Sequence, residues 1–246
     1  MPAIDPALAA AVCIVFAAAV VRGYSGFGFS LLTITALSLI YPPQQILPVI
    51  FMMELAASIH MLPGIWRDIH WRSLAPLIAG CAVATPLGVW LLVNVPAAPM
   101  QLAMSVFVLV AVLLMACGFA LKSMPGTAAS ALAGAASGLA NGAFGIGGPP
   151  VILFYFASPA GHAAGRASLI AFFLATDIIG LASQGPHGLI TGKALLMAAI
   201  LLPPLIAGVW LGSRAFKGSN PEAFKKWVLA ILAVLAVILG LKAFFT

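Results

Sequence analysis

The chain has 246 residues, of which 63% are hydrophobic and only 7% are charged, whereas soluble domains carry about 25% charged residues. So few polar side chains cannot cover a water-facing surface, which excludes a soluble enzyme. The net charge of +6 comes from basic residues placed singly or in small groups between apolar runs, which excludes the clustered patch of a nucleic-acid site.

Apolar runs of near-spanning length recur from end to end, and no polar stretch is long enough for a second domain. In lipid such runs must be helical, because a helix satisfies its own backbone hydrogen bonds. The sequence therefore predicts one all-α, polytopic membrane domain over residues 1–246. The apolar segments are 7–21, 26–41, 44–63, 73–93, 99–121, 127–141, 145–158, 167–184, 193–213 and 225–245.

Two neighbouring pairs of segments are short and joined by glycine-rich linkers, namely 7–21 with 26–41 and 127–141 with 145–158. A helix of about 15 residues is about 22 Å long, which is less than the hydrocarbon core of about 30 Å. We therefore expect each pair to form two half-helices that enter and leave on one side, or two short tilted spans.

The two halves of the chain resemble each other. Apolar segments follow the same order in both, and short motifs recur in register. This predicts two repeats, 1–124 and 125–246, each with a Gly-linked helix pair and three transmembrane helices. The recurring residues are Gly23, Gly26 and Gly28, matched by Gly142, Gly145 and Gly147, and Gly88-Val89-Trp90-Leu91, matched by Gly208-Val209-Trp210-Leu211.

The basic residues predict the orientation. If each linked pair enters and leaves on one side, each half crosses the membrane an odd number of times and the repeats have inverted topology. Most Lys and Arg then fall on one side, which the positive-inside rule makes cytoplasmic, with both termini outside. The residues on the cytoplasmic side are Arg67, Arg72, Lys122, Arg166, Arg214, Lys217, Lys225 and Lys226, and those on the other side are Lys193 and Lys242.

The linkers are the candidate binding site. Glycine permits sharp turns and close approach of a ligand, and Pro149 suits the first turn of a helix. Each linker thus predicts a helix N-terminus inside the membrane, where unpaired N–H groups favour an anion. Close packing of helices through small residues is the alternative. The candidate contacts are Arg22, Gly23, Tyr24, Ser25, Gly26 and Gly28 in one linker and Asn141, Gly142, Gly145, Gly147 and Gly148 in the other.

Arg22 directly follows one short apolar segment, and Glu54 and Asp177 lie about ten residues into others, where ionisable groups are costly and usually functional. Arg22 could neutralise an anionic substrate, reach an interface, or pair with a carboxylate. Glu54 and Asp177 each lie well inside a segment, and proton coupling, a counter-ion role or a buried structural pairing with Arg22 all stay open. No Walker loop or hydrolytic or redox motif is present, and we expect neither a metal nor a cofactor.

At these motifs the chain resembles the TauE/SafE family of sulfite exporters and related anion permeases. The resemblance covers essentially the whole chain. It implies export of sulfite, of a sulfonate such as sulfoacetate or sulfolactate, or of another small anion, in a bacterial inner membrane. The residues that carry it are Gly23-Tyr24-Ser25-Gly26-Phe27-Gly28, Gly138, Asn141 to Pro150, and Gly165-Arg166-Ala167-Ser168.

The resulting hypothesis is a secondary transporter for a small sulfur-containing anion, with substrate between the two linker helix ends and one repeat rocking against the other. An anion channel, or a permease for another anion such as a carboxylate, would carry the same motifs. A membrane enzyme or an assembly subunit is a further alternative. The partners expected are a small anion and membrane lipid, and not nucleic acid, while a homodimer stays open.

Overall fold

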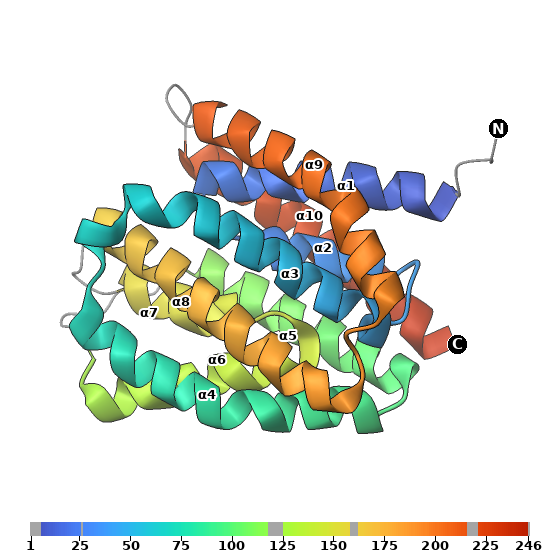
Figure 1. Cartoon of the computed structure of the whole chain (residues 1–246), viewed down its shortest axis with the longest axis horizontal. Coiled ribbons are helices and arrows are strands. Elements are labelled where there is room, and N and C mark those ends of the chain that lie inside the picture. Colours follow the sequence, from blue (N-terminus) through green and yellow to red (C-terminus); the bar gives the residue numbers. More distant parts are fainter. Residues whose placement is uncertain (1–5, 26, 118–124, 158–161, 216–220, 246) are drawn as a thin grey trace.

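A computed structural model of the chain describes residues 6–25, 27–117, 125–157, 162–215 and 221–245, and the described part is helical with no strand (Figure 1). The predicted all-α class is confirmed. Short 3₁₀ turns at Leu62–Gly64, Trp66–Asp68 and Gly185–His187 join some of the helices. The helices are α1 Pro6–Ser25, α2 Phe29–Leu37, α3 Pro43–Met61, α4 Trp71–Asn94, α5 Ala97–Ala116, α6 Thr127–Phe144, α7 Gly148–Ala157, α8 His162–Gln184, α9 Gly192–Ala215 and α10 Pro221–Phe245.

Both glycine linkers interrupt the helical chain, as predicted, but the flanking helices are not two equal halves. In each pair a long helix precedes a short one: α1 has 20 residues and α2 has nine, and α6 has 18 and α7 has ten. At 1.5 Å per residue, α1 is about 30 Å long and can cross a bilayer. The prediction that segment 7–21 is a short helix was therefore wrong, because the helix continues through the polar residues Arg22 to Ser25.

Helices α3 and α8 contact each other and cross the middle of the bundle, between the α1–α9 pair and the α4–α6 pair (Figure 1). The span formed mostly by α8 is 61% buried, whereas the other candidate spans are 28–39% buried. The outer helices pair across the halves of the chain: α1 lies on α9, α4 on α6 and α5 on α10. In chain order α6 has the place in the second half that α1 has in the first, and α9 the place of α4, so the α1–α9 and α4–α6 contacts join corresponding helices.

The recurring Gly-Val-Trp-Leu motif makes the same packing contact in both halves. Gly88 of α4 lies against the backbone of α6, and Gly208 of α9 lies against the backbone of α1, so that a side chain at either glycine would collide with the neighbouring helix. Trp90 and Trp210, two residues later, are each 52% exposed on the outer surface. The motif therefore fixes helices from opposite halves in direct backbone contact, as small residues do in membrane bundles.

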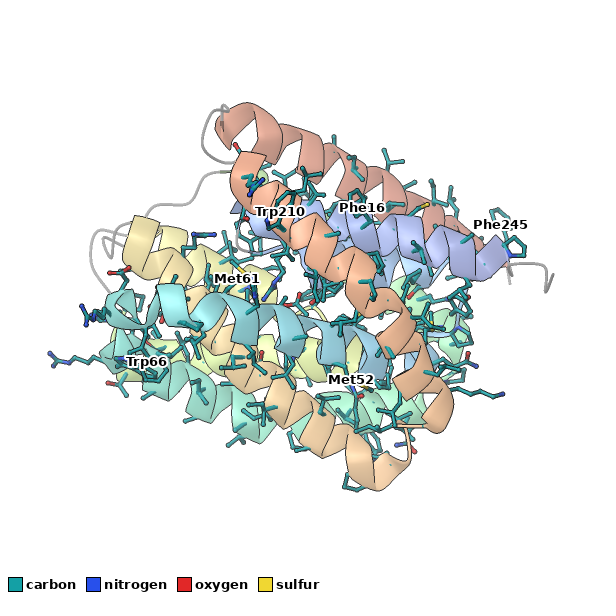
Figure 2. All side chains as sticks on the ribbon, turned by 45° about the horizontal axis from the view of Figure 1, so that its top comes forward. Phe16, Met52, Met61, Trp66, Trp210 and Phe245 are labelled. Atoms are coloured by element: carbon teal, nitrogen blue, oxygen red, sulfur yellow. The ribbon has the colours of Figure 1, made fainter. Side chains whose placement is uncertain are left out.

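Five helices among the described residues are long and apolar enough to cross a membrane, and large apolar side chains such as Val83 and Leu132 are exposed on the outside. Trp66 and Trp71 stack edge to face with ring centroids 5.0 Å apart. Figure 2 shows Trp66 and Phe245 at opposite ends of the molecule. Aromatic rings at the ends of apolar helices are typical of the two faces of a bilayer.

Candidate functional site

The first helix break turns at Gly28, whose φ of 91° lies in the left-handed region that glycine adopts without strain. The turn ends α1 at Ser25 and lets α2 begin at Phe29. All of α2 except Ser30 is buried, so its N-terminus lies inside the protein and its first N–H groups cannot bond to bulk water. An acceptor from elsewhere in the chain must satisfy them.

Glu54 of α3 supplies that acceptor. Its Oε1 atom accepts hydrogen bonds from the backbone N–H of Ser30 (3.0 Å) and from the Ser30 hydroxyl (2.6 Å). Its Oε2 atom forms an ion pair with Nη1 of Arg22. The carboxylate thus occupies the positive end of α2, where negative charge is stabilised by the helix dipole.

Arg22 is fully buried and is held on several sides. Besides the ion pair with Glu54, its Nη2 atom donates a hydrogen bond to the hydroxyl of Ser58 (2.8 Å). Its guanidinium carbon lies 5.6 Å from the centroid of the Phe173 ring. The pairing of Arg22 with a carboxylate, one of the roles left open by the sequence, is therefore the arrangement that the structure has.

The second helix break has the same kind of turn but no charged residue closing it. Gly145 has a φ of 68°, and the Ser137 hydroxyl donates a hydrogen bond to the carbonyl of Gly147. The side-chain amide of Asn141 donates to the carbonyl of Thr176 (3.3 Å). Helix α7 then begins at Gly148, and the next two residues are prolines, which have no N–H to offer.

A small cavity of about 20 Å³ lies between the two breaks. It has room for about one water molecule. Asp177 of α8 lies at its wall, is 3% exposed, and has an Oδ2 atom without a hydrogen-bond partner. The cavity therefore joins both breaks to both intramembrane carboxylates. The lining residues are Gly28, Ser30, Leu31, Glu54, Asn141, Gly145, Ile146, Gly147, Gly148, Ile152, Phe173 and Asp177.

The structure brings together only part of the predicted set of contacts. Gly28, Asn141, Gly145, Gly147, Gly148, Glu54 and Asp177 line the cavity, whereas Arg22, Gly23, Tyr24 and Gly142 do not. Gly23 packs against the backbone of Val209 and Gly142 against that of Thr85, so both serve close helix packing. Tyr24 is buried, Ser25 is the last residue of α1, and Gly26 lies outside the described residues.

Five lining residues were missed by the sequence reasoning, namely Ser30, Leu31, Ile146, Ile152 and Phe173. Ser30 is the second residue of α2, and a hydroxyl in the first turn of a buried helix could have indicated a polar contact. Phe173 lies one helical turn before Asp177 on α8, and residues four apart share a helix face. The pairing of Ser30 with Glu54 had no signal, since these residues lie 24 positions apart on different helices.

Comparison with known proteins identifies the family of the chain. The family described as "Sulfite exporter TauE/SafE" matches residues 11–239. The chain is 25% identical over 226 residues to a "Probable sulfite/organosulfonate exporter TauE" of Cupriavidus necator, covering 89% of this chain and 87% of that protein. No solved structure matches the chain. With the family match covering both helix breaks and nearly all of the helical bundle, the chain belongs to the sulfite exporter TauE/SafE family of multi-pass membrane transporters.

Proposed function

We propose that this protein is a secondary transporter that exports sulfite or an organosulfonate across the cytoplasmic membrane, and that the anion binds in the cavity between the two helix breaks. The observation that carries this proposal is the meeting of both breaks at one small cavity, lined in part by polar groups, in the middle of a TauE/SafE chain. The relative from Cupriavidus necator is named for the same two substrate classes.

The cavity lining suits a small oxyanion. Asn141 offers an amide with a second N–H besides the one that bonds to Thr176, and the backbone at Gly147 and Gly148 leads into the N-terminus of α7. Such groups bind anions by direct hydrogen bonds and through the helix dipole. A space for about one water molecule is too small for sulfite. The structure is thus a closed conformation, and we expect the helices around the cavity to separate when substrate enters.

The packing suggests which helices move together. Because glycine contacts join α1 to α9 and α4 to α6, the sequence halves cannot separate as rigid bodies without breaking them. We therefore propose that the α1–α9 pair and the α4–α6 pair each move as a unit around the central helices α3 and α8. Alternating access is kept, but the moving bodies are these two helix pairs and not the two repeats. Each pair contains one helix from either half of the chain.

The orientation proposed from the sequence fits the fold. The beginnings of α4 and α8 lie together, since the N–H of His70 bonds to the Ser168 hydroxyl (2.9 Å). In Figure 1, α9 also ends at this end of the molecule, whereas both termini lie at the other. Arg72, Arg166 and Arg214 are therefore on one side, opposite both termini. We propose that this side faces the cytoplasm and that the repeats have inverted topology.

Sulfite efflux from proteoliposomes tests the proposed function. Wild-type protein is expected to release sulfite at a rate that saturates with its internal concentration, whereas a channel would conduct without saturation. Asn141→Ala removes a cavity amide and should lower efflux about tenfold, the effect of one hydrogen bond to a charged ligand. Ser213→Ala, at an exposed hydroxyl of α9, is the matched control. The absence of sulfite efflux by the wild type, or unchanged efflux by Asn141→Ala, would contradict the proposal.

A further inference from the structure

The two carboxylates at the cavity differ in what holds them. Glu54 has an ion pair with Arg22 and two hydrogen bonds from Ser30, so its negative charge is fully matched. Asp177 is as deeply buried, yet its Oδ2 atom meets no donor. A buried carboxylate without a partner is costly in the interior of a membrane protein. The two groups therefore cannot have the same role.

The charged neighbours of Asp177 do not neutralise it. Glu54 from α3 and Arg22 from α1 act on it with opposite signs, and the charge of Arg22 is already paired with that of Glu54. From α4 the thiol of Cys81 faces it, and from α7 the only titratable group is Tyr155, whose hydroxyl is bonded to Ser73 (3.0 Å). Helices α2 and α6 carry no titratable side chain. The described surroundings thus leave one negative charge unmatched when Asp177 is ionised.

An anion cannot enter such a cavity beside an ionised Asp177 without strong repulsion, because charges interact strongly where water is excluded. Protonation removes the repulsion and also turns Oδ2 into a donor that can bond to the anion. Protonation of Glu54 would have the opposite effect, since it would leave the buried Arg22 unpaired and remove the acceptor at the end of α2.

We propose that Asp177 takes up one proton from solution each time the transporter binds its anion, and that proton and anion cross the membrane together. This inference rests on the proposed function. A sulfonate with one negative charge then moves with one proton and transfers no net charge. The sign of the pH dependence follows: the protonated form binds the anion, so affinity is highest at low pH and falls as the pH rises through the range in which Asp177 loses its proton.

Calorimetric titration with methanesulfonate tests the proposal, because this probe keeps one negative charge throughout the working pH range and does not itself release protons. Binding to the purified full chain is measured at one pH in two buffers of different ionisation enthalpy, which gives the number of protons taken up. At a pH above the range in which Asp177 loses its proton, the wild type should take up close to one proton per anion. Above the range in which Asp177 ionises, its affinity should fall about tenfold per pH unit.

Asp177→Asn keeps the size of the side chain and its hydrogen-bonding capacity but cannot ionise. It is expected to take up no proton and to bind with an affinity that does not change with pH. Asp68→Asn is the matched control, since Asp68 is an exposed carboxylate in the 3₁₀ turn before α4, and it should behave as the wild type. Asp177→Glu should restore proton uptake, which separates titration from a purely structural role.

A measurement on the wild type alone keeps the proposal testable if Asp177→Asn does not fold. Methanesulfonate efflux from proteoliposomes should be insensitive to a potassium-diffusion potential and should change with an imposed pH gradient. Binding without proton uptake, binding that requires sodium, or efflux that follows the membrane potential would each overturn the inference while leaving anion transport intact. Absence of binding by both methanesulfonate and sulfite would instead overturn the proposed function.

Discussion

The two helix breaks have the same glycine geometry but are closed by different chemistry. At the first break, the end of α2 is capped by Glu54, whose charge is matched by the buried Arg22. At the second, the hydroxyl of Ser137 and the amide of Asn141 hold the turn by hydrogen bonds. Asn141, which is neutral, stands at the position that matches Arg22. A repeated backbone feature thus carries a fixed charge pair in one half and a neutral polar lining in the other.

This difference indicates that the two breaks have different roles. At the first break the carboxylate of Glu54 already occupies the N-terminus of α2. A substrate that bound there would have to displace this carboxylate, which is held by Arg22. The N-terminus of α7 has no such occupant among the described residues, and Gly147 and Gly148 face the cavity directly. We therefore expect the first break to matter most for stability and the second for binding of the substrate.

The largest effect is expected where the charge pair is broken. Glu54→Ala leaves Arg22 buried without its carboxylate, and loss of one partner of a buried pair costs about 3–5 kcal/mol. The thermal unfolding midpoint of the detergent-purified protein should fall sharply, and the double variant Arg22→Met/Glu54→Leu should recover a large part of it. A single variant as stable as the wild type would show that the pair does not hold the first break.

A smaller effect is expected from adding a methyl group at each turn. Gly28→Ala should cost about 1–2 kcal/mol from its left-handed backbone alone, because the nearest side chain, Val21, leaves an ordinary 3.5 Å contact. Gly145→Ala also lies in the left-handed region and in addition places its Cβ 2.8 Å from the buried side chain of Leu47, so we expect it to be the more destabilising of the two. Equal unfolding midpoints for the two variants would contradict this ranking.

The hydrogen bonds that close the second break should contribute less to the free energy of unfolding than the charge pair at the first. Ser137→Ala removes the hydrogen bond to the Gly147 carbonyl and should lower the free energy of unfolding by about 1 kcal/mol. Sulfite efflux should fall by more than this loss of stability explains, because Gly147 lines the cavity. Thermal unfolding and efflux measured on one preparation check both, and a loss of stability as large as that of Glu54→Ala would break the comparison.

The smallest effect is expected outside both breaks. Trp90→Leu changes a half-exposed side chain on the outer face of α4 while Gly88 keeps its contact with α6. A surface change of this kind alters stability by no more than about 0.5 kcal/mol. Sulfite efflux should match that of the wild type, and a marked loss of transport would show that the outer face takes part in function.

The sequence was informative where local chemistry decides the structure. The glycine linkers predicted both breaks, and the two helix N-termini at Phe29 and Gly148 follow from glycine turns and from prolines in a first turn. The length of α1 was misjudged because Arg22 was read as the end of an apolar helix. Its neutralisation by Glu54 allows the helix to continue, and that pairing joins residues on separate helices, which periodicity cannot reveal.

The candidate site was only partly predictable for the same reason. Gly28, Gly145, Gly147 and Asp177 could be selected from their residue type and their place in an apolar segment. Gly23 and Gly142 have the same local signature but serve contacts between helices from opposite halves, and only the tertiary packing separates these two uses of glycine. The inverted topology of the repeats and the identity of the anion stay predictions.

The central claim is that the anion binds between the two helix breaks, and anomalous diffraction from crystals soaked with selenite, a heavier analogue of sulfite, tests it most directly. The account predicts one selenium peak within the cavity lined by Ser30, Asn141 and Gly148, which disappears when sulfite is added in excess. Selenium peaks found only on the outer surface, or a cavity peak that sulfite does not displace, would contradict it.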